Sequence, residues 1–185
     1  MQLRASTAVV TAPRLVTAVC TSFCLVIAVL ALPRASSAQP EAARPATILL
    51  VRHAEKAGTT GDVSLSAPGQ ARAVRLASML KDADVTHIFT SELLRTRATA
   101  APLARQRGLT SQPMPGAALD DLVAKLRALP AGAVALVVHH SNTVPKIAER
   151  LGVAKVPPIK EDEFDRLLVI TRSGDGVSRL LTLRY

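Results

Sequence analysis

Three short polar segments carry the side chains of this sequence that are best suited to chemistry on an anion. Residues 52–55 read Arg-His-Ala-Glu, residues 139–142 read His-His-Ser-Asn, and Arg95 lies between them. Arginine binds phosphate oxygens through paired hydrogen bonds, and a neutral imidazole is usable as a nucleophile near neutral pH. If the three segments meet in the fold, they predict a cationic site for a small phosphorylated partner.

The elements that precede these segments are expected to bring them together. Residues 48–51 and 133–138 are continuous aliphatic runs of the kind found in buried parallel strands, and residues 85–89 form a third expected strand. Ligands of open α/β sheets bind beyond the carboxyl ends of the strands. We therefore expect the polar segments to converge at one edge of a sheet.

The remaining elements complete an α/β pattern. Strand-like and helix-like segments alternate, and the last two strands are joined by a hairpin signal at 173–176. This order predicts a three-layer α/β sandwich with a mostly parallel central sheet and an antiparallel edge. The expected helices are 67–81, 92–107, 120–129 and 141–151, and the further strands are 112–114, 167–171 and 177–183.

Local residues predict where these helices begin or break. Ser66 is the expected N-cap of the first helix, and either Asp120 or Asp121 is the expected N-cap of the third. Pro102 is expected to kink or break the second helix, because proline lacks the backbone donor. The fourth helix is expected to be capped by Ser141 and Asn142.

The N-terminal segment has the order of a secretory signal. Arg4 and Arg14 precede an apolar run at 15–32, and small residues follow at 35–38. We expect cleavage after Ala38 and an exported protein, periplasmic or extracellular. The alternative is an uncleaved N-terminal membrane anchor, because the run approaches the length needed to span a bilayer.

Composition limits what the rest of the chain can be. With 185 residues, 49% of them apolar, a single domain at 46–185 is expected after a flexible lead-in at 39–45. The charged fraction of 20% and mean hydropathy of +0.27 exclude a disordered chain. Aromatic residues make up only 2%, which disfavours a stacking platform for nucleic acid, and the basic excess is spread along the chain. Cleavage would also remove both cysteines, Cys20 and Cys24.

Four motifs in register resemble branch 1 of the histidine phosphatase superfamily, the phosphoglycerate mutase-like group, in a short exported bacterial form. Residues 52–55 are similar to its Arg-His-Gly-Glu signature, with alanine in place of glycine. Residues 65–71 resemble its Leu-Ser-x-x-Gly helix start, and residues 91–100 its Ser-x-x-x-Arg-x-x-x-Thr-Ala segment. Residues 137–143 resemble the block that holds its second catalytic histidine.

The resemblance implies a phosphatase with a phosphoglycerate mutase-like fold. His53 would attack phosphorus to give a phosphohistidine, which water would then hydrolyse. His140 is preferred to His139 as the second histidine because it directly precedes the Ser-Asn pair, and strand alternation should send the two rings to opposite faces. The resemblance implies no metal ion or other cofactor, and it assigns His53 and His140 to catalysis and Arg52, Arg95, Ser141 and Asn142 to the phosphate.

The proton donor for the leaving group is less well defined. Family members commonly supply a carboxylate from the region between the second and third strands, where this chain offers Asp120 without a clear acidic motif. Glu55 is a second candidate for an acid or orienting role. Lys56 and residues 59–63 are expected to help select the substrate, and residues 160–165 are expected to form a solvated loop.

Two other function classes remain open. A metal-dependent hydrolase could use His53, His87 and the histidine pair, but no two histidines have the spacing of a helical HExxH site. A noncatalytic anion-binding protein of the cell envelope is the other alternative, because no acid is evident. A mutase is disfavoured because the chain lacks room for the insertions that enclose its substrate.

Overall fold

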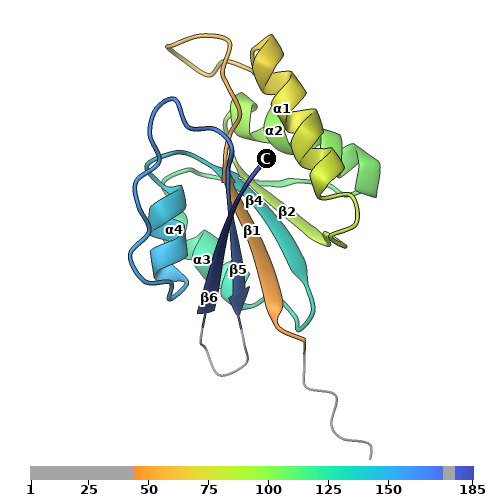
Figure 1. Ribbon diagram of the computed structural model, residues 1–185, viewed down its shortest axis with the longest axis vertical. Coiled ribbons are helices and arrows are strands. Elements are labelled where there is room, and N and C mark those ends of the chain that lie inside the picture. The colour runs from red at the N-terminus through yellow and green to blue at the C-terminus, as the bar shows by residue number, and fades with distance from the viewer. Residues whose placement is uncertain (1–43, 173–177) are drawn as a thin grey trace, which may run out of the picture. The chain divides into compact units, whose positions relative to one another are not determined.

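A six-stranded sheet organises the chain in this computed structural model, which describes residues 44–172 and 178–185 (Figure 1). The strands are β1 (Ala46–Arg52), β2 (His87–Ser91), β3 (Gln112–Met114), β4 (Val134–His139), β5 (Arg166–Arg172) and β6 (Ser178–Arg184). The helices are α1 (Ala67–Met79), α2 (Leu94–Arg107), α3 (Leu119–Arg127) and α4 (Val144–Arg150).

The sheet order is β3-β2-β4-β1-β5-β6. The first four strands in this order pair in parallel. β5 runs antiparallel to β1, and β6 runs antiparallel to β5. The mostly parallel sheet with an antiparallel edge is therefore confirmed, and it brings the carboxyl ends of β1, β2 and β4 side by side.

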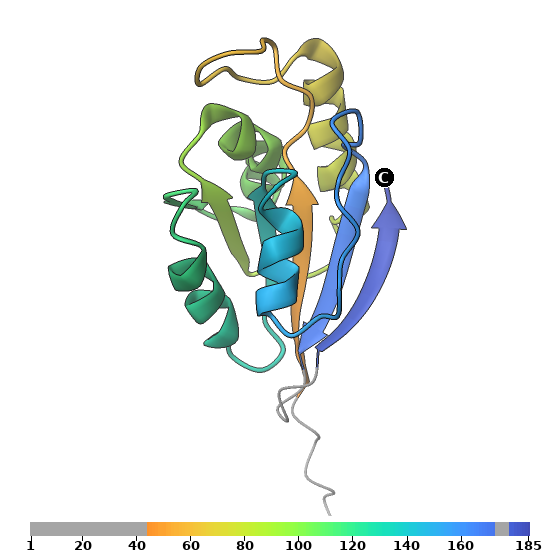
Figure 2. The ribbon, with the colours of Figure 1, turned by 90° about the vertical axis from the view of Figure 1, so that its left-hand side faces the viewer.

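Helices cover both faces of the sheet, with α1 and α2 on one side and α3 and α4 on the other (Figures 1 and 2). Alternate residues of β1 serve the two faces, as the period of a strand requires. Ile48 and Leu50 pack in the core with α3 and α4, whereas Leu49 and Val51 pack with α1 and α2. This double burial explains why β1 reads as an unbroken aliphatic run.

The structure contradicts the expected break at Pro102 and the expected cap of α3, and it confirms the cap of α1. α2 continues through Pro102 without a break, and Leu103 and Ala104 beyond it are buried in the core. Neither Asp120 nor Asp121 caps α3. Both lie in its first turn, where a negative side chain interacts favourably with the helix dipole. Ser66 does cap α1, because its hydroxyl accepts the N–H of Gly69.

The fourth helix also begins later than expected. α4 starts at Val144, and its N-cap residue is Thr143 rather than the Ser141-Asn142 pair. These two residues instead form a turn that follows β4. Their side chains are therefore positioned by the turn.

Some sequence predictions lie outside the described residues. These are the signal at 1–38, most of the lead-in at 39–45 and the hairpin turn at 173–176. Among the residues that are described, no helix has the length and apolar character needed to cross a membrane.

Candidate active site

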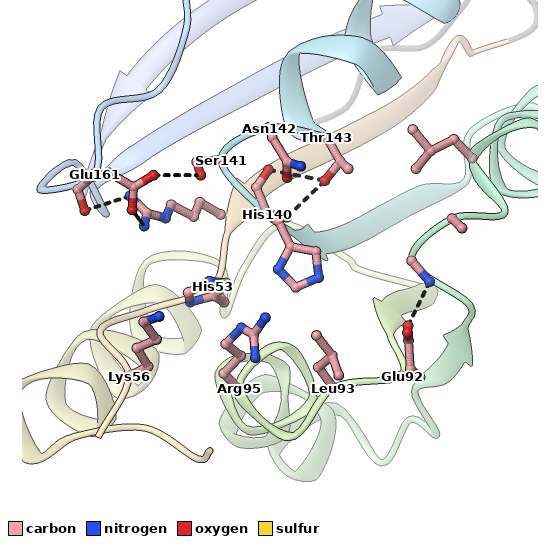
Figure 3. A pocket seen from close by; sticks show the side chains of 14 residues that line it. His53, Lys56, Glu92, Leu93, Arg95, His140, Ser141, Asn142, Thr143 and Glu161 are labelled. Carbon is pink, nitrogen blue, oxygen red and sulfur yellow. Dashed lines mark hydrogen bonds and ion pairs between the residues drawn. The ribbon is translucent and has the colours of Figure 1, made fainter. Parts of the chain in front are cut away.

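A cavity of about 610 Å³ lies beyond the carboxyl ends of β1, β2 and β4 (Figure 3). Its wall comes from residues at and after the ends of β1, β2, β3 and β4, from the first residue of α3, and from Glu161 in the loop before β5. The three polar segments singled out in the sequence therefore converge. The predicted site residues that line the cavity are Arg52, His53, Arg95, His140, Ser141 and Asn142.

His53 directly follows β1 and is almost completely buried, with an exposed fraction of 5%. Its Nδ1 lies 2.8 Å from the carbonyl oxygen of Ala54. Because a carbonyl can only accept, Nδ1 carries the proton and the neutral ring keeps its lone pair on Nε2. That nitrogen is the one suited to attack an electrophile.

The surroundings of His53 keep the ring neutral. Burial is the largest cause that lowers the pKa of His53 to about 4; the positive charges of Arg52, Arg95 and Lys56 contribute to the same shift, and the hydrogen bond to the Ala54 carbonyl opposes it. Desolvation and nearby like charge both disfavour the imidazolium form. The ring is therefore a neutral imidazole across the physiological pH range.

His140 lies across the cavity from His53, with ring centroids 5.4 Å apart. Its Nε2 is 3.0 Å from the Ser91 hydroxyl, which in turn lies 2.9 Å from the Thr96 hydroxyl. This contact orients the ring and ties the end of β4 to the end of β2. Burial is the largest cause that lowers the pKa of His140 to about 4; the neighbouring His53 ring and the Arg95 guanidinium contribute, and the Glu92 carboxylate opposes the shift.

His139 and His140 do not point to opposite faces. Their rings meet edge to face, with centroids 5.0 Å apart, because β4 ends at His139 and strand alternation does not extend to the next residue. His139 is buried against the Thr143 hydroxyl and does not line the cavity. His140 is the member of the pair that faces the cavity.

Arg52 is held by the loop at residues 160–165, which was expected to be solvated. Its Nη1 donates to the backbone carbonyls of Lys160, Glu161 and Glu163, at 2.7, 2.9 and 3.1 Å. Its guanidinium carbon lies 4.1 Å from the centre of the Phe164 ring. Residues 160–165 do form a loop without helix or strand, exposed at 160–162, as expected. The sequence did not predict that the backbone carbonyls of this loop fix the Arg52 guanidinium at the cavity wall.

Both cavity arginines retain an unused donor. The Nε atoms of Arg52 and Arg95 are buried and have no hydrogen-bond partner among residues 44–172 and 178–185. Arg95 is positioned through its backbone, whose carbonyl accepts the Thr99 hydroxyl, while the same hydroxyl accepts the N–H of Ala54. This link ties α2 to the residue that follows His53.

Glu55 does not line the cavity. Its carboxylate is held by the guanidinium of Arg72 from α1, with contacts of 2.7 and 2.9 Å. The backbone of Glu55 also passes so close to Gly69 that a Cβ there would lie 2.1 Å from the Glu55 carbonyl oxygen. Glu55 therefore joins the segment after His53 to α1. From this place outside the cavity it can orient that segment but cannot contact a bound group.

Asp120 is also outside the cavity wall. Its carboxylate is 89% exposed and pairs with Arg150 at 3.0 Å. Direct proton donation from Asp120 to a group in the cavity is therefore contradicted by its position in α3.

Two carboxylates that sequence reasoning missed line the cavity instead. Glu161 contacts Arg52 Nη2 at 3.2 Å and the Ser141 hydroxyl at 3.5 Å, and Glu92 accepts the N–H of Gly116 at 2.6 Å. Glu92 directly follows the last residue of β2, which was a usable signal. Glu161 carried no such signal, because residues 160–165 follow no predicted strand. Lys56 lines the cavity as well, in agreement with its expected place near the substrate.

No cluster of three or more histidine, cysteine or acidic side chains with the geometry of a metal site occurs in residues 44–172 and 178–185.

The family model of the histidine phosphatase superfamily, branch 1, matches residues 48–118, which include most of β1, His53 and Arg95. The predicted resemblance to this superfamily is thereby confirmed. The matched residues end before β4, so His140 is placed at the site by the fold and by the sequence motif. A search of curated proteins found no match to the sequence.

Solved structures of two phosphatases and a phosphoglycerate mutase share the fold. The protein histidine phosphatase SixA complexed with tungstate is 18% identical, with a TM-score of 0.63, and the match covers 75% of this chain and 96% of SixA. A mycobacterial glucosyl-3-phosphoglycerate phosphatase with inorganic phosphate is 16% identical, with a TM-score of 0.60 and coverage of 75% and 96%. A phosphoglycerate mutase from Plasmodium falciparum is 17% identical, with a TM-score of 0.54 and coverage of 75% and 89%. The phosphoglycerate mutase-like fold is therefore established.

Proposed function

We propose that this protein hydrolyses small phosphomonoesters through a covalent phosphohistidine on His53, without a metal ion. The observation that carries the proposal is the neutral His53 ring, whose unprotonated Nε2 belongs to a cavity lined by Arg52, Arg95 and His140. The superfamily match and the phosphatases among the structural neighbours support the same reaction class.

The proposed reaction has two displacements at phosphorus. In the first, His53 Nε2 forms a bond to phosphorus while the bond to the leaving oxygen breaks. In the second, water attacks phosphorus, the N–P bond breaks, and phosphate and the neutral ring are released. The two arginine guanidiniums balance the phosphoryl charge throughout.

The covalent step is tested by trapping the intermediate. Full-length protein is mixed with a 32P-labelled aryl phosphate, quenched in alkali, and digested to locate the label. We expect an alkali-stable, acid-labile phosphoryl group on His53, together with a burst of released phenol. His53→Asn should lose the label and the turnover, whereas His87→Asn, which removes an imidazole outside the cavity, should keep both.

The alternatives give different results in the same assay. A noncatalytic anion-binding protein would bind phosphate without any label or turnover. A metal-dependent hydrolase would lose turnover in the presence of a chelator, whereas phosphohistidine chemistry should be unaffected. More than a tenth of the turnover remaining in His53→Asn would overturn the assignment of the nucleophile.

We also propose that the protein acts after export, with residues 1–38 removed. The support is the order of basic, apolar and small residues in that segment. N-terminal sequencing of protein recovered from the envelope or medium of the expressing cells should begin at Gln39. An intact Met1 on membrane-bound protein would show the anchored alternative instead.

A further inference from the structure

The part of the cavity away from His53 differs in chemistry from the part that holds the arginines. Its wall is formed by Leu93, Ala117 and Leu119, with Gly116 and a single carboxylate, that of Glu92. Leu93 and Glu92 come from the segment between β2 and α2, and the other three residues come from the segment between β3 and α3 and the first residue of α3. This wall is apolar with one negative charge, whereas the rest of the cavity is rich in positive charge.

The direction of the proposed reaction places the leaving group against this wall. In a displacement at phosphorus, the leaving oxygen departs on the side opposite the nucleophile. Figure 3 shows His53 and Glu92 on opposite sides of His140. A phosphoryl group held between His53, His140 and Arg95 would therefore direct its leaving part toward Glu92.

Glu92 is held in place without being neutralised. Its Oε2 accepts the N–H of Gly116 at 2.6 Å, and no basic side chain among the described residues forms an ion pair with it. A backbone N–H fixes the position of the carboxylate without supplying a formal positive charge. Glu92 Oε1 remains available to a group in the cavity.

Gly116 keeps the space between Glu92 and His140 open. A Cβ at this position would lie 3.4 Å from Glu92 Oε2 and 3.9 Å from His140 Nε2. The carboxylate and the imidazole thus border the same small volume. A leaving part of only a few atoms would span from the phosphoryl group to the carboxylate.

We propose that Glu92, Leu93, Gly116, Ala117 and Leu119 form a leaving-group subsite for a short chain that ends in a cationic nitrogen. The substrate class is then a monophosphoryl compound whose leaving part is positively charged. This inference rests on the proposed function, because it uses the direction of attack from His53. The apolar wall packs against the carbon atoms of the leaving part, and the Glu92 carboxylate pairs with the cation.

The test compares two substrates of the same shape. Choline phosphate carries a trimethylammonium group, and 3,3-dimethylbutyl phosphate replaces that nitrogen with carbon. The ratio of their kcat/KM values is measured in the wild-type protein and in Glu92→Gln, whose side chain has the same size and can still accept the N–H of Gly116. Intrinsic differences in leaving-group reactivity cancel when the two ratios are compared.

We expect the preference for choline phosphate to fall about fivefold in Glu92→Gln, the effect of one partly solvated charge pair. Asp82→Asn is the matched control, because it removes one exposed negative charge that pairs with Lys81 and lies outside the cavity. Its ratio should equal that of the wild-type protein. Gly116→Ala, which fills the subsite, should weaken the binding of both compounds. The inhibition constant of inorganic phosphate in this variant should stay within twofold of the wild-type value.

A binding measurement separates failure of this inference from failure of the proposed function. The dissociation constants of the two compounds are measured by calorimetry in the His53→Asn background, with and without Glu92→Gln, so that turnover is not required. The same fivefold loss of preference is expected there. Equal ratios with and without Glu92 would overturn the cationic subsite even if the phosphatase is active. Equal slowing of both substrates in Glu92→Gln would do so too, and would assign Glu92 to proton donation.

Discussion

The buried histidines predict a specific loss of stability in mild acid. Burial lowers the pKa of His139 to about 4, and the same cause dominates for His53. An unfolded chain would hold each ring near the ordinary value of about 6.5. Because the folded pKa is the lower one, the unfolded state takes up protons first. Stability is therefore full above about pH 6.5 and falls as the pH drops toward about 4.

The magnitude follows from those two values. Between pH 7 and pH 5, a single ring with this shift lowers the free energy of unfolding by about 2 kcal/mol. The conversion applies to His139 without a discount for solvent screening, because the side chain is only 1% exposed. His139 is the better ring to test, since it does not line the cavity and its replacement leaves the proposed nucleophile intact.

The assay is urea denaturation at pH 7 and pH 5, with wild-type protein and His139→Asn. Far-UV circular dichroism is the suitable probe, because the chain has no tryptophan and one tyrosine. The variant should be less stable than the wild type at pH 7. The loss of unfolding free energy between pH 7 and pH 5, however, should be smaller in the variant than in the wild type by about 2 kcal/mol. Contributions from groups that do not interact with His139 cancel in this comparison. An unchanged pH difference would refute the claim that the folded state holds His139 neutral.

Two further predictions concern the anion site. Arg95→Ala should raise the inhibition constant of inorganic phosphate about tenfold or more, because it removes a half-buried cation from the cavity. The constant is measured by competition against an aryl phosphate. An unchanged constant would show that Arg95 does not bind the phosphate. Glu161→Gln should strengthen phosphate inhibition about threefold, because the carboxylate competes for Arg52 and Ser141 but is 89% exposed. Weaker inhibition in this variant would show that Glu161 supports the site.

The sheet and the convergence of the site were predictable because both follow from burial. Residues 48–51 and 133–138 are aliphatic throughout since both faces of β1 and β4 are covered by helices. Parallel pairing of these strands then aligns Arg52 with His139 in register. The rule that sites form beyond the strand ends was sufficient to bring His53, Arg95 and His140 together.

Features that depend on tertiary contacts were not predictable. The segment at 160–165 is acidic and reads as solvated, but its backbone carbonyls are the partners of the buried Arg52 guanidinium. Side-chain patterns in a sequence do not predict which backbone carbonyl will accept a hydrogen bond from an arginine far away in the chain. The expected acid role of Asp120 was not supported for a related reason. The sequence does not reveal that Arg150 of α4 lies beside α3 and pairs with Asp120.

Burial acts differently on the two kinds of base in the cavity, and this difference is what makes the site usable. It lowers the pKa of both Arg52 and His53. The guanidinium starts from such a high value that it stays charged, and backbone carbonyls with Glu161 further support its charge. The imidazole starts near neutrality, so the same desolvation removes its proton and leaves Nε2 free. One dry environment therefore supplies both a permanent cation for the phosphoryl oxygens and a neutral nucleophile. Arrival of a dianion opposes the desolvation effect on His140 and favours its protonation there, where it can donate to the bound phosphoryl group.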